Sequence, residues 1–377
     1  MAIHGKKSRI AVGGYDLSGM GHSARQTFSK ELAPSDVFLD SDHYNEAGQK
    51  TGMFTFEGRQ RGDNAAFRQL IEDISLNADN NPEIAFGPNG FGAGGQVFLS
   101  EAWGNTLEPG TDNRSVVSIT GGFQAHGGVY EGTVLGSPYA GGSGTLLANP
   151  TAAPTVSAGT GTYAAGTYLL AYSYVNDAGE TLVSPTASVV LGTTGGFGVI
   201  APALPAGAVG VRVYVSSTGG SATTLKLVLY STTPSSMTIS NPPAATATSP
   251  RAVNTTDSVL LSIISATGNG AVHDRGAAYA TASATGWFIQ SNLIRADNPA
   301  ASISVAFHHS ATGAFAGEQV LLGTLGPFSD IGSARAVSPL ATSTLSRYVR
   351  AAYTVTGTNA RFAVLPTFAW VRPSATQ

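Results

Sequence analysis

Hydrophobic and polar residues alternate in short runs along most of the chain, which is the pattern of half-buried β-strands. In the run 166–174, Tyr168, Leu170, Tyr172 and Tyr174 occupy every second position. Gly, Pro, Asn and Asp separate such runs, as they do at turns. We therefore predict strands at residues 8–12, 51–58, 97–100, 114–120, 129–135, 166–174, 181–190, 195–201, 209–216, 225–230, 236–239, 258–265, 287–291, 301–308, 319–325, 344–354 and 361–371.

One segment has the helical period instead. Its apolar residues between positions 66 and 74 fall on a single stripe at helical spacing. Asp63 precedes the stripe and is a suitable N-cap residue. The pattern predicts one α-helix over residues 63–76.

Composition divides the chain into three segments. Residues 148–250 are bounded by Asn149-Pro150 and Ser249-Pro250, and they contain almost no charge. Their short, regularly spaced strands are typical of a small β-sandwich. The flanking segments, 1–147 and 251–377, have similar strand patterns. We therefore expect a single β-domain that is interrupted at a loop by an inserted second domain. The predicted fold class is mainly β, a sandwich or barrel with one helix.

Charge is scarce in this chain. Of its 377 residues, 42% are hydrophobic but only 11% are charged, and 47 are glycine. No apolar run approaches the roughly 20 residues of a membrane-spanning helix, so we expect no membrane segment. A weakly charged surface is expected where other subunits cover it.

The charge that is present is unevenly distributed. The net charge of −3 divides into −6 for residues 1–150, zero for 151–250 and +3 for 251–377. No region has the basic stripe of a nucleic-acid-binding protein. The uneven division has two explanations that stay open: chance, or complementary faces that steer neighbouring copies together.

The cysteine count and the N-terminus bear on where the protein folds. The chain contains no cysteine, which excludes disulfides and thiolate metal sites. Its first residues carry only a three-residue apolar run, Ile10–Val12, which is too short for a secretory signal. We therefore expect synthesis and folding in a cytoplasm.

Two motifs suggest chemistry but lack its context. Residues 90–95 match GxGxxG, yet a strand-like run follows them where a dinucleotide site needs a helix. His308 and His309 are adjacent, so in a strand they face opposite sides and cannot share a metal. Neither motif supports a cofactor or metal site.

Acidic residues at positions 40, 42 and 46 provide no better candidate. Asp40, Asp42 and Glu46 do not have the spacing of a calcium loop. A solvated or partner-facing loop is the simpler interpretation. We predict no catalytic residue, no cofactor and no enzymatic activity.

Four motifs, in order, resemble the tail tube proteins of long-tailed, siphovirus-type bacteriophages. The first two resemble the opening strand and turn of that family and its strand followed by a helix. The last two resemble its strand-and-turn with a His-Ser pair and its arginine-containing ending. The motifs are residues 5–19 (GKKSRIAVGGYDLSG), 52–74 (GMFTFEGRQRGDNAAFRQLIEDI), 304–315 (SVAFHHSATGAF) and 345–373 (LSRYVRAAYTVTGTNARFAVLPTFAWVRP).

This resemblance implies a structural virion protein. Subunits of the family form stacked hexameric rings that build the hollow tail tube, through which DNA passes during infection without specific binding. The implied partners are further copies of the chain, the tape measure protein, and tail terminator or baseplate proteins. The implied location is the phage tail of the virion, after synthesis in the host cytoplasm.

The middle segment resembles the immunoglobulin- or fibronectin-like modules of phage surface proteins. The resemblance lies in residues 166–185 and 205–220. It implies an Ig-like sandwich, inserted over residues 148–250, that projects outward from the tube. Contact of this insert with host surface glycans stays open, and we expect its excision to leave assembly intact.

Candidate contact residues between subunits come from two places. The acidic stretch 38–50 is expected to reach a neighbouring subunit or ring, and the arginines of the last motif are a second set. The candidates are Phe38, Asp40, Asp42, Tyr44, Glu46, Lys50, Arg347 and Arg350.

Two other functions remain as alternatives. One is a minor tail, baseplate or capsid-associated structural protein with the same fold. The other is a carbohydrate-binding adhesin that uses Trp103, Trp287 or the tyrosines of the insert.

Overall fold

The protein is almost entirely built of β-strands. The computed structural model describes residues 8–18, 21–34, 45–59, 82–110, 118–125, 129–243, 247–251, 254–274, 286–337 and 345–371. Within them, strands β1 to β25 are accompanied by one short 3₁₀ helix, Ala222–Thr224. The predicted mainly-β fold is thus confirmed. The helix predicted at residues 63–76 lies outside the described residues.

The largest sheet curls into an almost closed barrel. Its strand order is β2-β1-β5-β6-β8-β25-β20-β23. Strands from both ends of the chain meet in it, because β8 pairs with β25 at Thr133 and Phe368. The strands are β1 (Arg9–Val12), β2 (Tyr15–Asp16), β5 (Glu83–Gly87), β6 (Gln96–Gly110), β8 (Tyr130–Val134), β20 (Gly286–Ala296), β23 (Gly332–Val337) and β25 (Phe362–Val371).

Side chains close this barrel where backbone pairing stops. Among the described residues no ladder joins β23 to β5. Ser333 instead donates a hydrogen bond to Glu83, and Arg335 pairs with Glu101. The β1–β2 turn also touches β23, since a Cβ added to Gly14 would lie 2.5 Å from the backbone of Gly332. We call this closure the barrel seam.

Alternate residues of the barrel strands fill two cores. The side chains on one face of β1 and β5 point into the barrel, and those on the other face pack beneath a second sheet. The first core contains Ala11, Ala85, Phe91, Val97, Leu99, Val134, Phe288, Leu365 and Ala369. The second contains Ile10, Val12, Leu17, Phe54, Phe56, Ile84, Phe86, Ala102 and Phe123.

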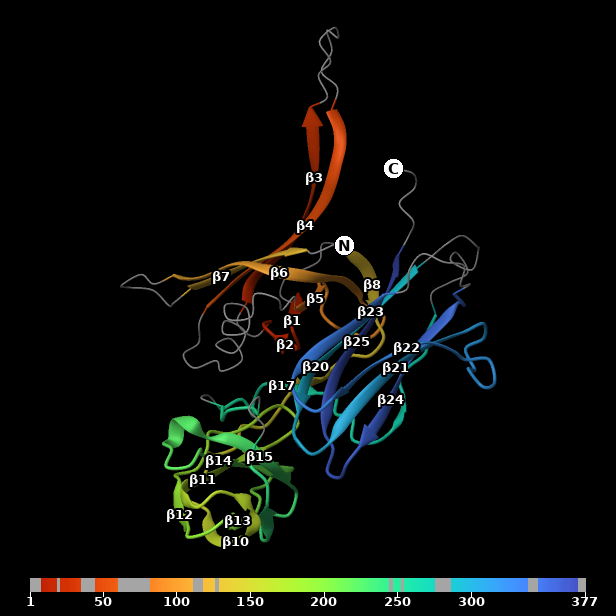
Figure 1. Cartoon of the computed structure of the whole chain (residues 1–377). Helices are drawn as coiled ribbons and strands as arrows, with labels where there is room; N and C mark the ends of the chain where they lie inside the picture. The colour runs from red at the N-terminus through yellow and green to blue at the C-terminus, as the bar shows by residue number, and fades with distance from the viewer. Residues whose placement is uncertain are drawn as a thin grey trace.

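Long strands carry the second sheet away from the barrel. The end of β6 leaves the barrel and pairs with β7 (Ser118–Ala125), which pairs with β4 (Asn45–Arg59), and β4 pairs with β3 (Gly21–Pro34). The β7 ladder on β4 ends at Met53. Beyond it, residues 28–34 of β3 pair only with 45–52 of β4. This two-stranded part, the distal ribbon, points away from the body (Figure 1).

A smaller sheet packs against β20 and β25 to complete a sandwich. Its order is β18-β24-β21-β22, with β19 also on β24. Ile289, Phe307 and Phe362, all 0% exposed, lie in the core between the layers. The strands are β18 (Gly268–Asn269), β19 (His273–Asp274), β21 (Ser302–Ser310), β22 (Val320–Phe328) and β24 (Tyr348–Thr356).

Residues 155–239 form a separate pair of antiparallel sheets, which we call the middle sandwich. The sheets have the orders β10-β13-β16 and β12-β11-β14-β15. Tyr163, Tyr168 and Phe197 contact one another edge to face between them. The strands are β10 (Thr155–Tyr163), β11 (Gly166–Val175), β12 (Ala187–Leu191), β13 (Gly195–Ile200), β14 (Gly210–Val215), β15 (Lys226–Ser231) and β16 (Met237–Ile239).

The two segments that lead into and out of the middle sandwich lie side by side. They form the antiparallel pair β9 (Tyr139–Ser143) and β17 (Val259–Leu261). Further on, the side-chain amide of Asn176 donates to the carbonyl oxygens of Thr145 and Thr256, at 3.0 and 2.9 Å. The middle sandwich therefore sits below the barrel on two adjacent chain segments (Figure 1).

Candidate assembly site and domain junction

The distal ribbon is the least supported part of the described sheets. At about 3.4 Å per residue, residues 28–34 extend about 24 Å beyond the last three-stranded part of the sheet. Among the described residues no strand pairs with the outer edge of β3. An isolated two-stranded ribbon is marginally stable in water. The backbone groups along this edge are therefore available to a strand of another chain.

The supported half of the same hairpin has one buried face. Phe54 and Phe56 are each 1% exposed and pack in the core beneath the second sheet. Met53 directly precedes Phe54, so its side chain lies on the opposite face of the strand, where it is 38% exposed. Ser23 and Arg25 of β3 are exposed. The hairpin is thus anchored by its base, and its outer half extends from that anchor.

The residues predicted as subunit contacts fall in two separate places. Glu46 and Lys50 lie in β4 on the distal ribbon, in register with Ala33 and Lys30. The other members of the acidic stretch lie outside the described residues. They are Phe38, Asp40, Asp42 and Tyr44.

Arg347 and Arg350 lie at β24, on a different side of the molecule from the distal ribbon (Figure 1). Arg347 Nε and Nη2 donate to the two carboxylate oxygens of Asp274 at 2.7 and 2.6 Å. Arg350 Nη2 donates to Gln319 Oε1 at 2.8 Å, and its guanidinium lies 4.3 Å from the ring centroid of Phe315. The structure does not bring these arginines together with Glu46 and Lys50.

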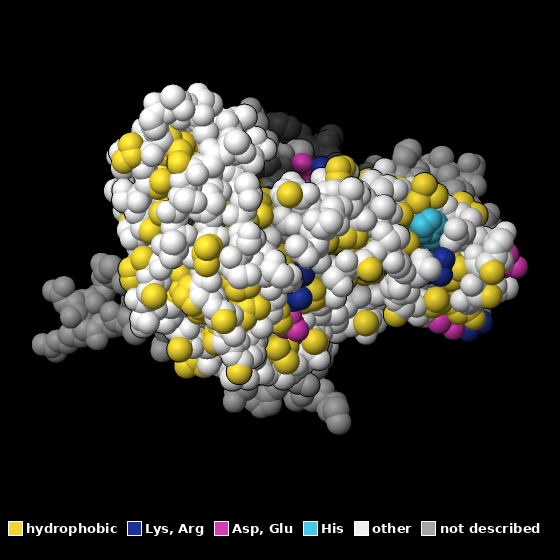
Figure 2. All heavy atoms as spheres, turned by 90° about the horizontal axis from the view of Figure 1, so that it is seen from below, with side chains coloured by type: hydrophobic (Ala, Val, Ile, Leu, Met, Phe, Trp, Pro, Cys, Tyr) yellow, Lys and Arg dark blue, Asp and Glu magenta, His cyan; other side chains and the backbone are white. Residues whose placement is uncertain are grey.

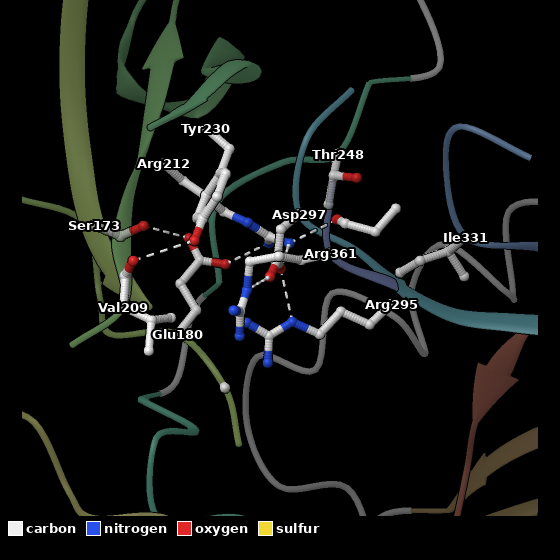
Figure 3. Close-up of polar contacts among 12 residues, drawn as sticks. Ser173, Glu180, Val209, Arg212, Tyr230, Thr248, Arg295, Asp297, Ile331 and Arg361 are labelled. Atoms are coloured by element: carbon white, nitrogen blue, oxygen red, sulfur yellow. Dashed lines mark hydrogen bonds and ion pairs between the residues drawn. The ribbon is translucent and has the colours of Figure 1, made fainter. Parts of the chain in front are cut away.

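A buried group of ionic side chains joins the middle sandwich to the sheets beside it (Figure 3). Its centre is Asp297, directly after β20, which is 0% exposed. Asp297 Oδ1 accepts from Arg212 Nη2 at 2.6 Å and from Arg295 Nε at 2.7 Å. Its Oδ2 accepts from Arg361 Nε at 3.1 Å. Arg212 belongs to β14 of the middle sandwich, so this carboxylate binds both parts of the chain.

Glu180 occupies the side of this group that belongs to the middle sandwich. Its Oε2 accepts from Arg212 Nη1 at 2.8 Å. Its Oε1 accepts from Ser173 Oγ at 2.5 Å and from the hydroxyl of Tyr214. Glu180 is 2% exposed and Arg212 4%. Glu180 therefore has one charged and two neutral donors, whereas the three donors to Asp297 are all guanidinium groups. Both buried carboxylates are paired, as buried charges require.

Further contacts extend the group toward solvent. Arg361 also pairs with Asp177, whose side chain is 47% exposed. Arg295 Nη2 donates to the carbonyl oxygen of Asn176 at 2.8 Å. The ion pairs of the group join three carboxylates to three guanidinium groups. We call it the junction network: Asp177, Glu180, Arg212, Arg295, Asp297 and Arg361.

Asp297 and Arg212 remain ionised across the neutral pH range, because their pKa values lie far outside it. Burial by itself would raise the pKa of Asp297, but Arg295 and Arg212 oppose it and lower that pKa to about 2. Burial opposes the charge of Arg212 as well, and the adjacent carboxylates of Glu180 and Asp297 raise its pKa above the ordinary arginine value. Burial, followed by the charge of Glu180, raises the pKa of Tyr214, which keeps that hydroxyl a donor.

Sequence reasoning did not single out the junction network, although one signal was present. Residues 151–250 contain four charged side chains: Asp177, Glu180, Arg212 and Lys226. The first three belong to the network. Arg212 in particular stands inside an apolar strand whose six residues are all buried. A lone arginine at such a position requires a buried partner.

The motifs that suggested chemistry have structural roles here. Residues 90–95 belong to the turn between β5 and β6, where Gly90 and Gly94 have φ values of 93° and 79°. His309 is 6% exposed, and its Nδ1 accepts from the backbone N–H of Ser346 at 3.0 Å. Trp287 packs against the core between β20 and the smaller sheet.

The described residues contain no group of His, Asp and Glu side chains that would hold a metal ion. Within the same residues, no helix has the length and hydrophobicity to cross a membrane. The face seen in Figure 2 consists mainly of uncharged atoms, with few acidic or basic side chains. This surface agrees with the 11% charge of the whole chain.

Comparisons with known proteins give only partial similarities. No protein-family model matches the chain, and no curated protein matches it either. A chain from the virion of a native gene transfer agent particle is 14% identical over 34% of this chain and 97% of its own, with a TM-score of 0.26. A chain from the sheath–tube complex of an extracellular contractile injection system in its extended state is 16% identical, over 35% and 93%, with a TM-score of 0.29. The SPP1 Dit protein, a hub protein of the adsorption apparatus of phages that infect Gram-positive bacteria, is 13% identical over 51% and 78%, with a TM-score of 0.24.

Proposed function

We propose that this chain is a structural subunit of a phage tail, and that copies of it assemble into the tail tube. The distal ribbon carries the proposal. It extends from an anchored base without a third strand among the described residues. The resemblance of the terminal motifs to tail tube proteins indicates that the assembly is a tail tube.

Strand pairing gives a physical route to such an assembly. A long free edge is an association hazard in a solitary protein. If the edge of β3 pairs with another copy, the ribbon gains the third strand that it lacks. Contacts between unlike surfaces of identical subunits close into rings when the rotation allows, and rings stack without limit. The proposed assembly is therefore a stack of hexameric rings, as the resemblance implies.

The charge distribution fits this proposal. An acidic first segment and a basic last segment favour contact between copies in one direction. A tube built from a net-acidic chain without a basic groove lets DNA pass with little adhesion. The tape measure protein and the terminator or baseplate proteins would meet such a tube inside and at its ends. The proposed location is the tail of the virion.

The middle segment completes the proposal. Residues 148–250 form an inserted Ig-like module, and 1–147 with 251–377 form the split tube domain. Support comes from the separate core of the middle sandwich and from the pairing of β9 with β17, which places both chain ends of the module together. A module of this size does not fit within a narrow bore, so it projects outward.

A shortened hairpin tests the assembly role. Residues 28–52 are replaced by Asn-Gly, a two-residue turn suited to hairpins, so that Thr27 connects to Met53 at the end of the supported half. Negative-stain electron microscopy of the purified full chain should reveal rings or tubes, and the shortened chain should stay dispersed while it retains its β-sheet circular dichroism.

Val190→Ser provides the control, because Val190 is 65% exposed on the middle sandwich, away from the ribbon. This variant should assemble as the unmodified chain does. Tubes from the shortened chain, or a solitary unmodified chain at high concentration, would refute the proposal.

A further inference from the structure

We infer that the junction network locks the middle sandwich to the rest of the chain as one rigid body, so that the sandwich acts as a fixed extension of the subunit rather than as a module swinging on a tether. This inference does not depend on the phage-tail proposal. It concerns how Arg212 and Glu180 of the middle sandwich engage Asp297, Arg295 and Arg361.

Three separate attachments restrict the middle sandwich. The first is the paired entry and exit strands, β9 and β17. The second is the junction network, which reaches from β14 to the ends of β20 and β25. The third runs through Thr248, whose carbonyl oxygen accepts from the backbone N–H of Leu227 in β15 at 2.9 Å and whose Oγ1 donates to Asp330 Oδ1 at 3.1 Å. A single attachment would permit rotation, whereas attachments at three places fix both angle and twist.

The central attachment is strongly directional. Asp297 receives hydrogen bonds from three guanidinium groups, at 2.6, 2.7 and 3.1 Å. Charge-assisted hydrogen bonds of this kind are short and depend on geometry. Because Asp297 is 0% exposed, water does not replace a bond that rotation would break. Movement of the sandwich would thus leave buried charges unpaired, which is strongly unfavourable.

The parts on either side of the junction also depend on each other. Excision of residues 148–250 would remove Asp177, Glu180 and Arg212 together. Arg295, Asp297 and Arg361 would remain with one more positive than negative charge and without their cover. The sequence alone leads us to expect that excision leaves assembly intact. The junction network instead leads us to expect that the excised chain loses stability before assembly is tested.

A rigid junction also limits what the middle sandwich can do. A module held at a constant angle repeats at regular positions along any assembly of this chain. Its outward surface then forms part of a fixed pattern. A tethered module would instead present its surface at many angles. The inferred role is a rigid spacer or lateral contact on the subunit.

Distance measurement between two spin labels tests rigidity directly. The chain has no cysteine, so Ser188→Cys on β12 and Thr354→Cys on β24, both exposed, give one unique label on each part. Pulsed electron paramagnetic resonance of the full chain in dispersed form should give a single narrow distance. The double variant Glu180→Gln/Arg212→Met removes one charge of each sign and should lose that narrow distance.

The matched control is Arg347→Met, which breaks an ion pair whose partners are 42% and 43% exposed. It should retain the narrow distance. Circular dichroism identifies variants that fail to fold, and for that case Arg361→Met, at a side chain 18% exposed, provides a milder disruption that should also broaden the distance. A broad distance in the chain with an intact junction would overturn the inference. A narrow distance in folded Glu180→Gln/Arg212→Met and in folded Arg361→Met would also overturn it.

Discussion

Replacing Asp297 by asparagine tests the energy held in the junction network. The substitution keeps size and shape but removes the negative charge shared by three arginines. The amide also resembles the protonated form of the carboxyl group. The pH dependence of Asp297 therefore provides a measure of what the substitution removes.

The magnitude follows from the pKa of Asp297. Its value falls from 3.8 to about 2 in the folded protein. At about 1.4 kcal/mol per pKa unit, this difference corresponds to about 2 kcal/mol of stability. Removing one partner of a buried ion pair commonly costs about 3–5 kcal/mol, because the remaining charges stay buried. We expect Asp297→Asn to lower the free energy of unfolding at neutral pH by at least about 2 kcal/mol.

The sign of the pH effect follows from the same values. Because the folded pKa is depressed, the stabilisation is complete above the unfolded value of 3.8 and is lost as the pH falls toward about 2. The stability difference between the unmodified chain and Asp297→Asn should shrink over that window. Urea denaturation of the dispersed protein at pH values from neutral to acid measures it.

Asp274→Asn is the matched control, because Asp274 also binds an arginine, Arg347, but its side chain is 43% exposed. An exposed pair contributes about 0–1 kcal/mol, so this variant should remain close to the unmodified chain. Equal stability of Asp297→Asn and the unmodified chain at neutral pH would show the reasoning to be wrong. A difference that did not decline in acid would do the same.

Two more predictions concern the barrel seam and β21. Gly13→Ala should lower the free energy of unfolding by about 1–2 kcal/mol, because Gly13 has a positive φ. Gly14→Ala should lower it clearly more in urea denaturation, because the added Cβ would lie 2.5 Å from Gly332. Equal losses of stability would contradict close contact at the seam. Burial, followed by the charge of Arg350, lowers the pKa of His308 below 6.5, so its contribution to stability is present above pH 6.5 and is lost as the pH falls. His308→Gln should reduce the loss of stability between about pH 7 and pH 5, and an unchanged loss would count against this assignment.

Strands that place alternate large apolar side chains in one core were predictable from the sequence. The run predicted at 166–174 corresponds to β11, Gly166–Val175, and the run at 361–371 to β25, Phe362–Val371. In both strands, alternate side chains enter a core, and this burial produces a two-residue period of apolar residues in the sequence. The division of the chain at residues 148 and 250 remains a prediction.

Where side chains replace backbone pairing, the pattern failed. A strand was predicted at 181–190, but the structure has only β12, Ala187–Leu191, in that region. Thr181 Oγ1 accepts from the backbone N–H of Tyr174, and Ser184 Oγ accepts from that of Tyr172. These hydroxyl oxygens occupy positions that a neighbouring strand would fill. Ser and Thr compete with sheet formation in this way, and their competition is not visible in hydrophobic spacing.

The distal ribbon was missed for a different reason. Residues 28–34 and 45–52 form strands, but they extend beyond the sheet that covers the core. Hydrophobic alternation marks strands that cover a core, and these residues continue the β3–β4 ladder past that point. The same applies to the junction network, whose members come from distant positions such as Glu180 and Asp297. Sequence indicates that Arg212 needs a partner but does not identify the partner.

The pairing of β8 with β25 has a consequence for biogenesis. Thr133 pairs with Phe368, which is synthesised much later. The loop between these two residues is long, and closing a long loop is entropically costly. The middle sandwich consists of strands that pair mostly within its own range, so we expect it to fold early on the nascent chain. Its completion would bring β9 and β17 together, which would shorten the loop between Thr133 and Phe368 by the residues from Tyr139 to Leu261. A folded middle sandwich would thus lower the entropic cost of pairing the late strands of the barrel with the early ones.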